Sequence, residues 1–282
     1  MAEIMDVRSL GLPFRVGTTS YIVADDLVGN ARFLAGRVQE MQLVLFDLPD
    51  GPSNLPDPAT VSELATIGQA GDLAYSVHLI EDVRLGEDGS TRHSSLIRAQ
   101  RVIRDALPLA PTAFVLHAEG RAIQSPQSPA DQVHAWQAQA VTALKLVAEM
   151  AGGGERLALE NLEGYPLDRI PPVAEAAGVG RCVDVGHLWL DGHDPVAYLS
   201  AALPQARMVH LHGVAEQDGR RRDHRSLAHM TPAQLDPVMA LLMASAFSGV
   251  VILEIFEEAD FHSSLAALVA SVNRIRAGKK MG

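Results

Sequence analysis

Imidazole and carboxylate side chains in this sequence stand repeatedly at the ends of short apolar runs. These residues are His78, His117, Glu160, Asp184, His187, His210 and Glu254. Carboxylates such as Glu160 and Glu254 are costly to bury without a partner, and several together raise one another's pKa values. Divalent cations relieve this repulsion, and mixed imidazole and carboxylate ligands suit zinc or manganese. The pattern therefore predicts a site for divalent metal ions.

Two local motifs add potential ligands. In the motif DVGH, the strand is expected to end at Asp184, and a turn at Gly186 would swing His187 back over the same site. In the loop expected after the seventh apolar run, Asp223 and His224 could complete the ligand set of another ion. A solvated, charged loop is the alternative interpretation of that segment, RRRDHR. With these motifs, the sequence predicts between one and three metal ions per chain.

An alternation of strands and helices would bring these residues together. Eight strands are expected at residues 15–20, 42–48, 74–80, 113–119, 156–162, 180–187, 208–214 and 250–256. Their nearly continuous apolar character is typical of parallel strands buried on both faces, and the stretches between them have helical spacing. One helix is expected to end at the glycine run 152–154, and Pro195 is expected in the first turn of another.

Eight such units in about 250 residues are typical of a (β/α)₈ barrel, whose strand C-termini form one ring that carries the active site. A doubly wound open sheet is the rival fold, but the sequence VGTTSYIVADD after the first strand contains no GxGxxG turn. No linker or low-complexity tract divides the chain. We therefore expect residues 1–282 to form a single α/β domain, a (β/α)₈ (TIM) barrel.

Composition and charge narrow the class of function. The 282 residues are 48% hydrophobic and 20% charged, with a formal net charge of −11 and no long basic run. This disfavours nucleic acid as a partner, because proteins that bind it usually present a basic face. The single cysteine, Cys182, excludes an intramolecular disulfide, and neither a membrane span nor a secretory signal is recognisable. We expect a cytoplasmic protein with a small-molecule substrate and no membrane partner; a homodimer is possible.

The order of the motifs resembles the xylose-isomerase-like superfamily of barrels, which includes sugar isomerases, epimerases and endonuclease IV. The resemblance covers nearly the whole chain. In the endonuclease branch it implies a trinuclear zinc site, with ligands matching His78, His117, Glu160, Asp184, His187, His210, His224 and Glu254. The endonuclease loop carries an acidic ligand two residues before its histidine. Here that position is Arg222, so Asp223 is the candidate substitute.

In detail the sequence looks most similar to cobamide-remodelling phosphodiesterases. The segments that carry this resemblance are PFRVGTTSYIV, VLFDLP, SVHLIEDVRLG, ENLEGYPLD, CVDVGHLWLDGHD, HLHGV and LEIF. It implies hydrolysis of the phosphodiester in the nucleotide loop of a corrinoid such as a cobalamin or pseudocobalamin coenzyme. Glu160 would bridge the ions, Glu254 would hold the ion that faces the phosphate, and His187 would steady the leaving oxygen.

Three further residues are candidates for substrate contact. Tyr165 and Trp189 fall just beyond the fifth and sixth strands, where they could line an apolar bowl for a corrin ring. Arg84 could meet a phosphate or an amide. The alternatives are that Trp189 packs into the rim and that Arg84 is a solvated loop residue.

Other classes of function stay open. A sugar isomerase or epimerase needs one metal ion, held here by Glu160, Asp184, His210 and Glu254, with the two glutamates transferring protons. In that interpretation His78 and His224 have no required role. A DNA-repair endonuclease and a non-catalytic corrinoid carrier or metal-binding module are the remaining alternatives.

Overall fold

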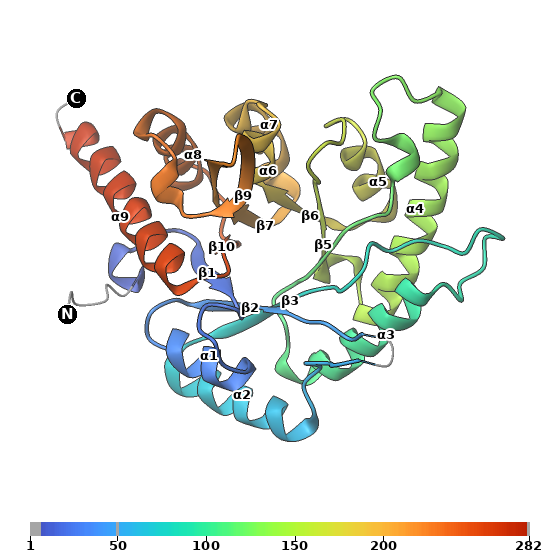
Figure 1. Cartoon of the computed structure of the whole chain (residues 1–282), viewed down its shortest axis with the longest axis horizontal. Helices are drawn as coiled ribbons and strands as arrows, with labels where there is room; N and C mark the ends of the chain where they lie inside the picture. Colours follow the sequence, from blue (N-terminus) through green and yellow to red (C-terminus); the bar gives the residue numbers. More distant parts are fainter. Residues whose placement is uncertain (1–6, 49–50, 281–282) are drawn as a thin grey trace.

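The centre of the molecule is a closed barrel of eight parallel strands surrounded by helices (Figure 1). The computed structural model describes residues 7–48 and 51–280, so residues 1–6, where a secretory signal would begin, lie outside the described residues. The barrel strands are β1 (Arg15–Thr19), β2 (Glu40–Val44), β3 (Ala74–His78), β4 (Phe114–Leu116), β5 (Leu157–Glu160), β6 (Gly180–Asp184), β7 (Ala206–Leu211) and β10 (Val250–Leu253). Strands adjacent in this order pair with each other, and β10 closes the barrel against β1. The expected (β/α)₈ barrel is confirmed.

Helices separate the strands along the chain. They are α1 (Leu27–Leu34), α2 (Pro58–Gly71), α3 (Ser94–Ala106), α4 (Ala130–Ala151), α5 (Ile170–Ala177), α6 (Val185–Leu190), α7 (Pro195–Ala202), α8 (Pro232–Ala244) and α9 (Glu258–Lys280). As expected, α4 ends at the glycine run, where Gly152 adopts the left-handed conformation with φ 85°, and Pro195 begins α7. Within the described ranges, no helix is long and apolar enough to cross a membrane.

Short 3₁₀ helices complete the connections. They span Val7–Leu10, Leu107–Leu109, Arg121–Ile123, Gly154–Arg156, Leu203–Gln205 and Leu227–His229. The Arg121–Ile123 turn follows β4 and so lies at the end of the barrel where the expected ligands stand.

Side chains alternate between the two faces of each strand, and this alternation separates two apolar clusters. The larger cluster packs between the strands and the helices. The smaller one fills the barrel interior and consists of Ala113, Val115, Ala158, Cys182, Met208, Val250 and Ile252. Continuing the inward positions toward the C-terminal ends leads from Ala158 to Glu160 and from Met208 to His210. The strand period therefore aims these polar groups at the barrel mouth.

Several expected segments differ from the structure, among them the fourth strand, which covers 114–116 instead of 113–119. β6 ends at Asp184, as expected for the DVGH motif, but the apolar run 180–187 continues into α6, because the carboxylate of Asp184 accepts the backbone N–H of His187 (2.6 Å) and caps this helix. His187 therefore lies in the first turn of a helix and not after a glycine turn. The loop expected after β7 is an antiparallel hairpin of β8 (Gly213–Gln217) and β9 (Arg220–Arg225). The second strand covers 40–44 instead of 42–48.

Candidate metal centre

The expected ligands meet at the C-terminal end of the barrel. A cavity of about 440 Å³ opens there, and six of them line it: His78, His117, Glu160, His187, His224 and Glu254. The other two, Asp184 and His210, are fully buried within reach of Glu160 or Glu254. The closed barrel thus brings together residues at or just after the ends of six strands with residues from an α-helix and a hairpin, although their role as ligands stays a prediction.

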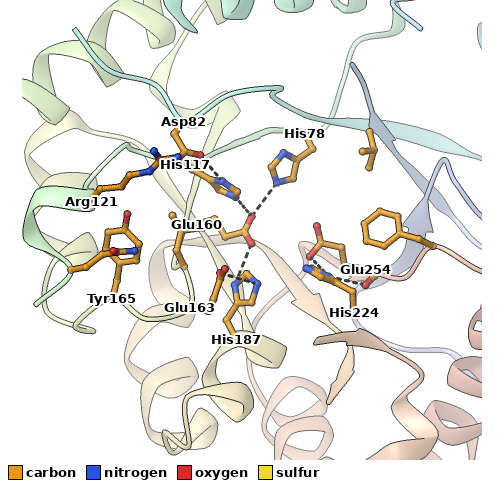
Figure 2. A pocket seen from close by; sticks show the side chains of 14 residues that line it. His78, Asp82, His117, Arg121, Glu160, Glu163, Tyr165, His187, His224 and Glu254 are labelled. Atoms are coloured by element: carbon orange, nitrogen blue, oxygen red, sulfur yellow. Dashed lines mark hydrogen bonds and ion pairs between the residues drawn. The ribbon is translucent and has the colours of Figure 1, made fainter. Parts of the chain in front are cut away.

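Glu160 occupies the middle of the centre (Figure 2). Its Oε2 lies 3.4 Å from Nε2 of His78 and 3.4 Å from Nε2 of His117. Its Oε1 lies 3.3 Å from Nδ1 of His210. The two carboxylate oxygens therefore face two different sets of residues.

These residues form two groups of potential ligands, and within each group the ligand atoms all lie within 4.8 Å of one another. One group is His78, His117 and Glu160, and the other is Glu160, Asp184, His210 and Glu254. Glu160 belongs to both, which is the position of a carboxylate that bridges two ions.

Hydrogen bonds fix the orientation of the two histidines on β3 and after β4. Nδ1 of His78 lies 3.0 Å from the carbonyl oxygen of Leu79, and Nδ1 of His117 lies 3.0 Å from Oδ1 of Asp82. Because these oxygens only accept, the proton of each neutral ring sits on Nδ1, and its Nε2 lone pair points at Glu160. Metal-binding histidines typically have such an outer hydrogen-bond partner.

Four buried polar atoms in the centre have no hydrogen-bond partner among the described residues. They are His117 Nε2, Glu160 Oε2, His210 Nδ1 and Glu254 Oε2. Unpaired buried polar atoms are rare and costly. Imidazole lone pairs and carboxylate oxygens are all acceptors and cannot satisfy one another. A divalent cation fits this donor set.

Neighbouring carboxylates raise the pKa values of two histidines in the centre. Burial alone would lower the pKa of His117, but the hydrogen bonds and charges of Asp82 and Glu160 outweigh it and raise the pKa to about 10. At His187 the same competition between burial and the charges of Asp184 and Glu160 raises the pKa to about 9. Binding of metal ions would have to displace these protons.

An irregularity in the hairpin turns two neighbouring residues toward the centre. Gly213 pairs with Arg225 and Ala215 with Arg222, so Asp223 and His224 together stand opposite a single residue of β8. This is a β-bulge, and His224 adopts the left-handed backbone conformation, with φ 48°. Bulges often re-aim side chains next to functional sites.

The bulge brings Asp223 close to both histidines at this side of the mouth. Oδ2 of Asp223 lies 3.9 Å from Nε2 of His187 and 3.8 Å from Nε2 of His224. The Nδ1 atoms of these histidines lie 3.1 Å and 3.2 Å from the carbonyl oxygens of Asn161 and Glu254. In the neutral rings the Nε2 atoms therefore carry the lone pairs and could bind an ion together with Asp223, although Nε2 of His187 also lies 3.5 Å from Oε2 of Glu163.

Of the three residues expected to contact substrate, the structure brings one to the cavity. Tyr165 lines it. Trp189 does not, because it is only 5% exposed and packs in the core between strands and helices. Arg84 does not line it either: its Nε donates to Nε2 of His93 (3.0 Å).

Sequence reasoning missed several residues of the cavity wall, namely Arg121, Gln124, Glu163 and Phe256. Arg121 stands beside Asp82 and Tyr165 in Figure 2 and brings a positive charge to this wall. Its place four residues after His117, just beyond the end of β4, is the signal that could have indicated it.

The fold and the centre define a (β/α)₈ barrel whose mouth carries a cluster of imidazoles and carboxylates. The chain belongs to the xylose isomerase-like TIM barrel family, whose model matches residues 39–277. Among curated proteins, no sequence gives a significant match.

Solved structures share the fold. A D-tagatose 3-epimerase-like protein is 15% identical, with 95% of this chain and 100% of that chain covered and a TM-score of 0.70. The IolI protein, solved with a bound zinc atom, is 15% identical (93% and 99% covered, TM-score 0.68). Endonuclease IV from Thermus thermophilus is 18% identical (92% and 99% covered, TM-score 0.64). At such identities these similarities show the fold alone.

Proposed function

We propose that this protein is a metal-dependent phosphodiesterase. The observation that carries the proposal is the position of Glu160, whose two oxygens face separate groups of ligands. Two ions in these groups, and a third between Asp223, His187 and His224, would form a multinuclear centre. When bound, divalent ions activate water and neutralise the charge of a phosphate.

The chain's own residues would divide the work. Asp82 keeps the His117 ring turned so that Nε2 faces Glu160. Glu160 would bridge two ions, and Glu254 would hold the ion that faces the phosphate. His187 lines the cavity beside Glu160 and would steady the leaving oxygen, so its position supports a role in catalysis.

The proposed substrate is a cobamide, cut in the phosphodiester of its nucleotide loop. This follows the sequence resemblance, and the cavity supports it in two respects. Tyr165, Leu162 and Phe256 give apolar surface near the ligands, while Arg121 gives one cationic group for a phosphate. The nucleotide loop would enter the cavity of about 440 Å³, and the corrin ring would lie across its rim.

A sugar isomerase or epimerase is the second candidate. The similar structures include a D-tagatose 3-epimerase-like protein and an L-ribulose 3-epimerase, which favours this function over hydrolysis. The group Glu160, Asp184, His210 and Glu254 would suffice for its single ion. The paired His78 and His117 around the other oxygen of Glu160 are not needed for that reaction, and for this reason we prefer the hydrolase.

The first test is to incubate the metal-loaded protein with a coenzyme cobamide and to identify the products by mass. Release of a cobinamide species and a lower-ligand nucleoside or nucleotide would support the proposal and locate the bond that is cut. Ketose sugars, assayed in parallel for epimerisation, test the second candidate. Epimerisation without cobamide cleavage, at one bound ion per chain, would overturn the hydrolase.

His78→Gln separates the two functions in a second way. The hydrolase should lose one bound ion and about 10²-fold or more in turnover, because the ring is one of only three groups in its set. His134→Gln, at an exposed position of α4, is the matched control and should change neither. Metal analysis and initial rates measure both; full activity of His78→Gln would instead favour the one-ion isomerase.

A further inference from the structure

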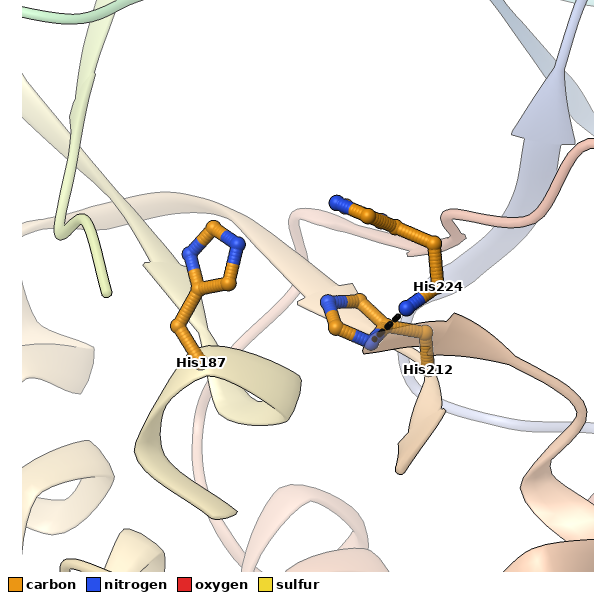
Figure 3. Close-up of side chains that lie close together, drawn as sticks. All are labelled: His187, His212 and His224. Carbon is orange, nitrogen blue, oxygen red and sulfur yellow. Dashed lines mark hydrogen bonds between the residues drawn. The ribbon is translucent and has the colours of Figure 1, made fainter. Parts of the chain in front are cut away.

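Three imidazole rings gather where the hairpin meets α6 (Figure 3). The ring centroids of His187 and His212 are 5.5 Å apart, those of His187 and His224 5.6 Å, and those of His212 and His224 4.3 Å. Each ring offers a nitrogen within 4.8 Å of the others. The cluster has the composition of a three-histidine metal site, but the hydrogen bonds of one ring, His212, differ from those of the other two.

The hydrogen bonds of His212 differ from those of its two neighbours. Nδ1 of His212 accepts the backbone N–H of His224 (3.0 Å, dashed in Figure 3), and a backbone N–H can only donate. The carbonyl of Gly213, at 3.3 Å, is the more distant partner of the same nitrogen. Nδ1 is therefore bare, and the proton of the neutral ring sits on Nε2. In His187 and His224 the protons are on Nδ1 instead.

The protonated nitrogen of His212 points at Asp184. Nε2 lies 3.2 Å from Oδ1 and 3.2 Å from Oδ2 of this fully buried carboxylate. Oδ1 of Asp184 also accepts the N–H of His187 (2.6 Å), while Oδ2 lies 3.7 Å from Nδ1 of His210. The backbone N–H of His187 in α6 and the ring of His212 before the hairpin therefore hold the carboxylate of Asp184, and its Oδ2 faces His210.

We propose that His212 is a positioning residue, which donates its Nε2–H to Asp184 and orients this carboxylate for metal binding, and is not itself a ligand. The proposal rests on the proposed metal centre. Because Nδ1 of His212 receives the N–H of His224 at the bulge, His212 also ties the hairpin to the ligands beneath it. Outer partners of this kind fix the direction of a metal-binding side chain.

The packing of the His212 ring also explains why the DVGH motif carries a glycine at position 186. A Cβ at Gly186 would overlap the ring of His212 at Cε1, Nδ1 and Nε2. The ring thus lies flat against the backbone of α6, and only glycine leaves room for it. Gly186 is required by the neighbour and not by its own backbone angles, since it is not among the glycines with positive φ.

Two substitutions test the proposal through metal affinity. His212→Met removes the donor, whereas His212→Gln carries an amide N–H that can replace Nε2–H. Cobalt(II) binding to the metal-free full-length protein, measured in competition with a chelator, should weaken about 10- to 100-fold in His212→Met. His212→Gln should recover it to within a few-fold, and both variants should bind as many ions at saturation as the wild type. Loss of one ion in both variants, or equal weakening in both, would overturn the proposal and make His212 a ligand.

A second measurement does not depend on metal binding. Two-dimensional ¹⁵N–¹H spectra that correlate the imidazole nitrogens should show His212 with a bare Nδ1 and a protonated Nε2, with zinc(II) and, at alkaline pH, without it. A protonated Nδ1, or an Nε2 signal shifted by zinc, would overturn the assignment. If the wild type binds no cobalt(II), the proposed metal centre fails, while the tautomer still decides whether His212 donates to Asp184.

Discussion

Two fully buried glutamates stand at opposite ends of the barrel interior, Glu160 at the end of β5 and Glu40 at the start of β2. Glu40 accepts a hydrogen bond from Oγ1 of Thr112, and its Oε2 lies 3.7 Å from Nε of Arg15. Among the described residues, no arginine forms an ion pair with Glu160. Its neighbours are imidazoles, and its Oε2 makes no hydrogen bond among the described residues.

The surroundings give the two carboxyl groups opposite charge preferences. Burial raises the pKa of Glu40 to about 7, because the hydrogen bond from Thr112 and the charge of Arg15 offset it only in part. Burial acts on Glu160 as well, but the charges of His210 and His117 outweigh it and hold its pKa well below the usual range. The surroundings therefore favour the charged carboxylate at the mouth, where a cation would bind it, and the neutral carboxyl group of Glu40 below about pH 7.

Glu160→Gln gives the largest expected effect. The amide keeps the shape of the side chain but removes the charge and one bridging oxygen, so turnover should fall about 10³-fold with bound metal reduced. Glu175→Gln, an exposed carboxylate on α5, should leave both unchanged. Rates, metal analysis and circular dichroism of the two variants test this. Retained activity with the ions still bound would remove Glu160 from the mechanism.

Gln42→Leu should have a smaller effect, exerted through His210. Nε2 of His210 lies 3.1 Å from the amide nitrogen, Nε2, of Gln42, which is fully buried on β2. If Nδ1 of His210 binds an ion, Nε2 carries the proton, and the Gln42 amide must turn over so that its oxygen, which has no partner among the described residues, accepts this proton. Removing that acceptor should weaken metal binding about 10-fold.

The matched variant for this test is Gln42→Glu. A carboxylate can only accept, so it should preserve the ring orientation that Gln42→Leu loses. Chelator competition on both proteins gives the comparison. Equal affinity in Gln42→Leu and the wild type would mean that the protein holds His210 without this contact.

The barrel and most of the centre could be predicted from the sequence, because strand ends converge in this fold wherever they lie in the chain. Ligand types at six strand ends therefore sufficed to place them in one ring. Hydrogen-bond partners could not be predicted in this way. Asp82 and Gln42 act on His117 and His210 from other strands or loops, and no local spacing relates them.

Local geometry explains the remaining differences. Trp189 was expected at the rim, but α6 starts directly after Asp184 and rotates this side chain into the core. Asp223 stands one position away from the acidic residue of the endonuclease pattern, and only the bulge at His224 turns it toward the centre. A one-residue bulge leaves no signal in hydrophobic periodicity.

A third expected effect concerns Glu40 and the pH dependence of stability. Its carboxyl has a pKa of about 7 in the folded protein, against an ordinary value of 4.5. Between these values the folded state holds a proton that the unfolded state has released, so the contribution is present at low pH and is lost as pH rises through 7. From pH 5 to pH 8 the wild type should lose about 2.5 kcal/mol of unfolding free energy through this group.

Glu40→Gln removes the titration and keeps the volume, so the difference between wild type and variant isolates Glu40 from all other pH effects, the metal ligands included. Urea unfolding of both proteins at pH 5 and pH 8 should show that the free energy of unfolding of the variant rises relative to that of the wild type as the pH increases. Parallel pH curves would mean that Arg15 already keeps Glu40 charged at pH 5. In that case the two ends of the barrel would hold their carboxylates in the same charge state, and the charge at the mouth would no longer distinguish the metal centre.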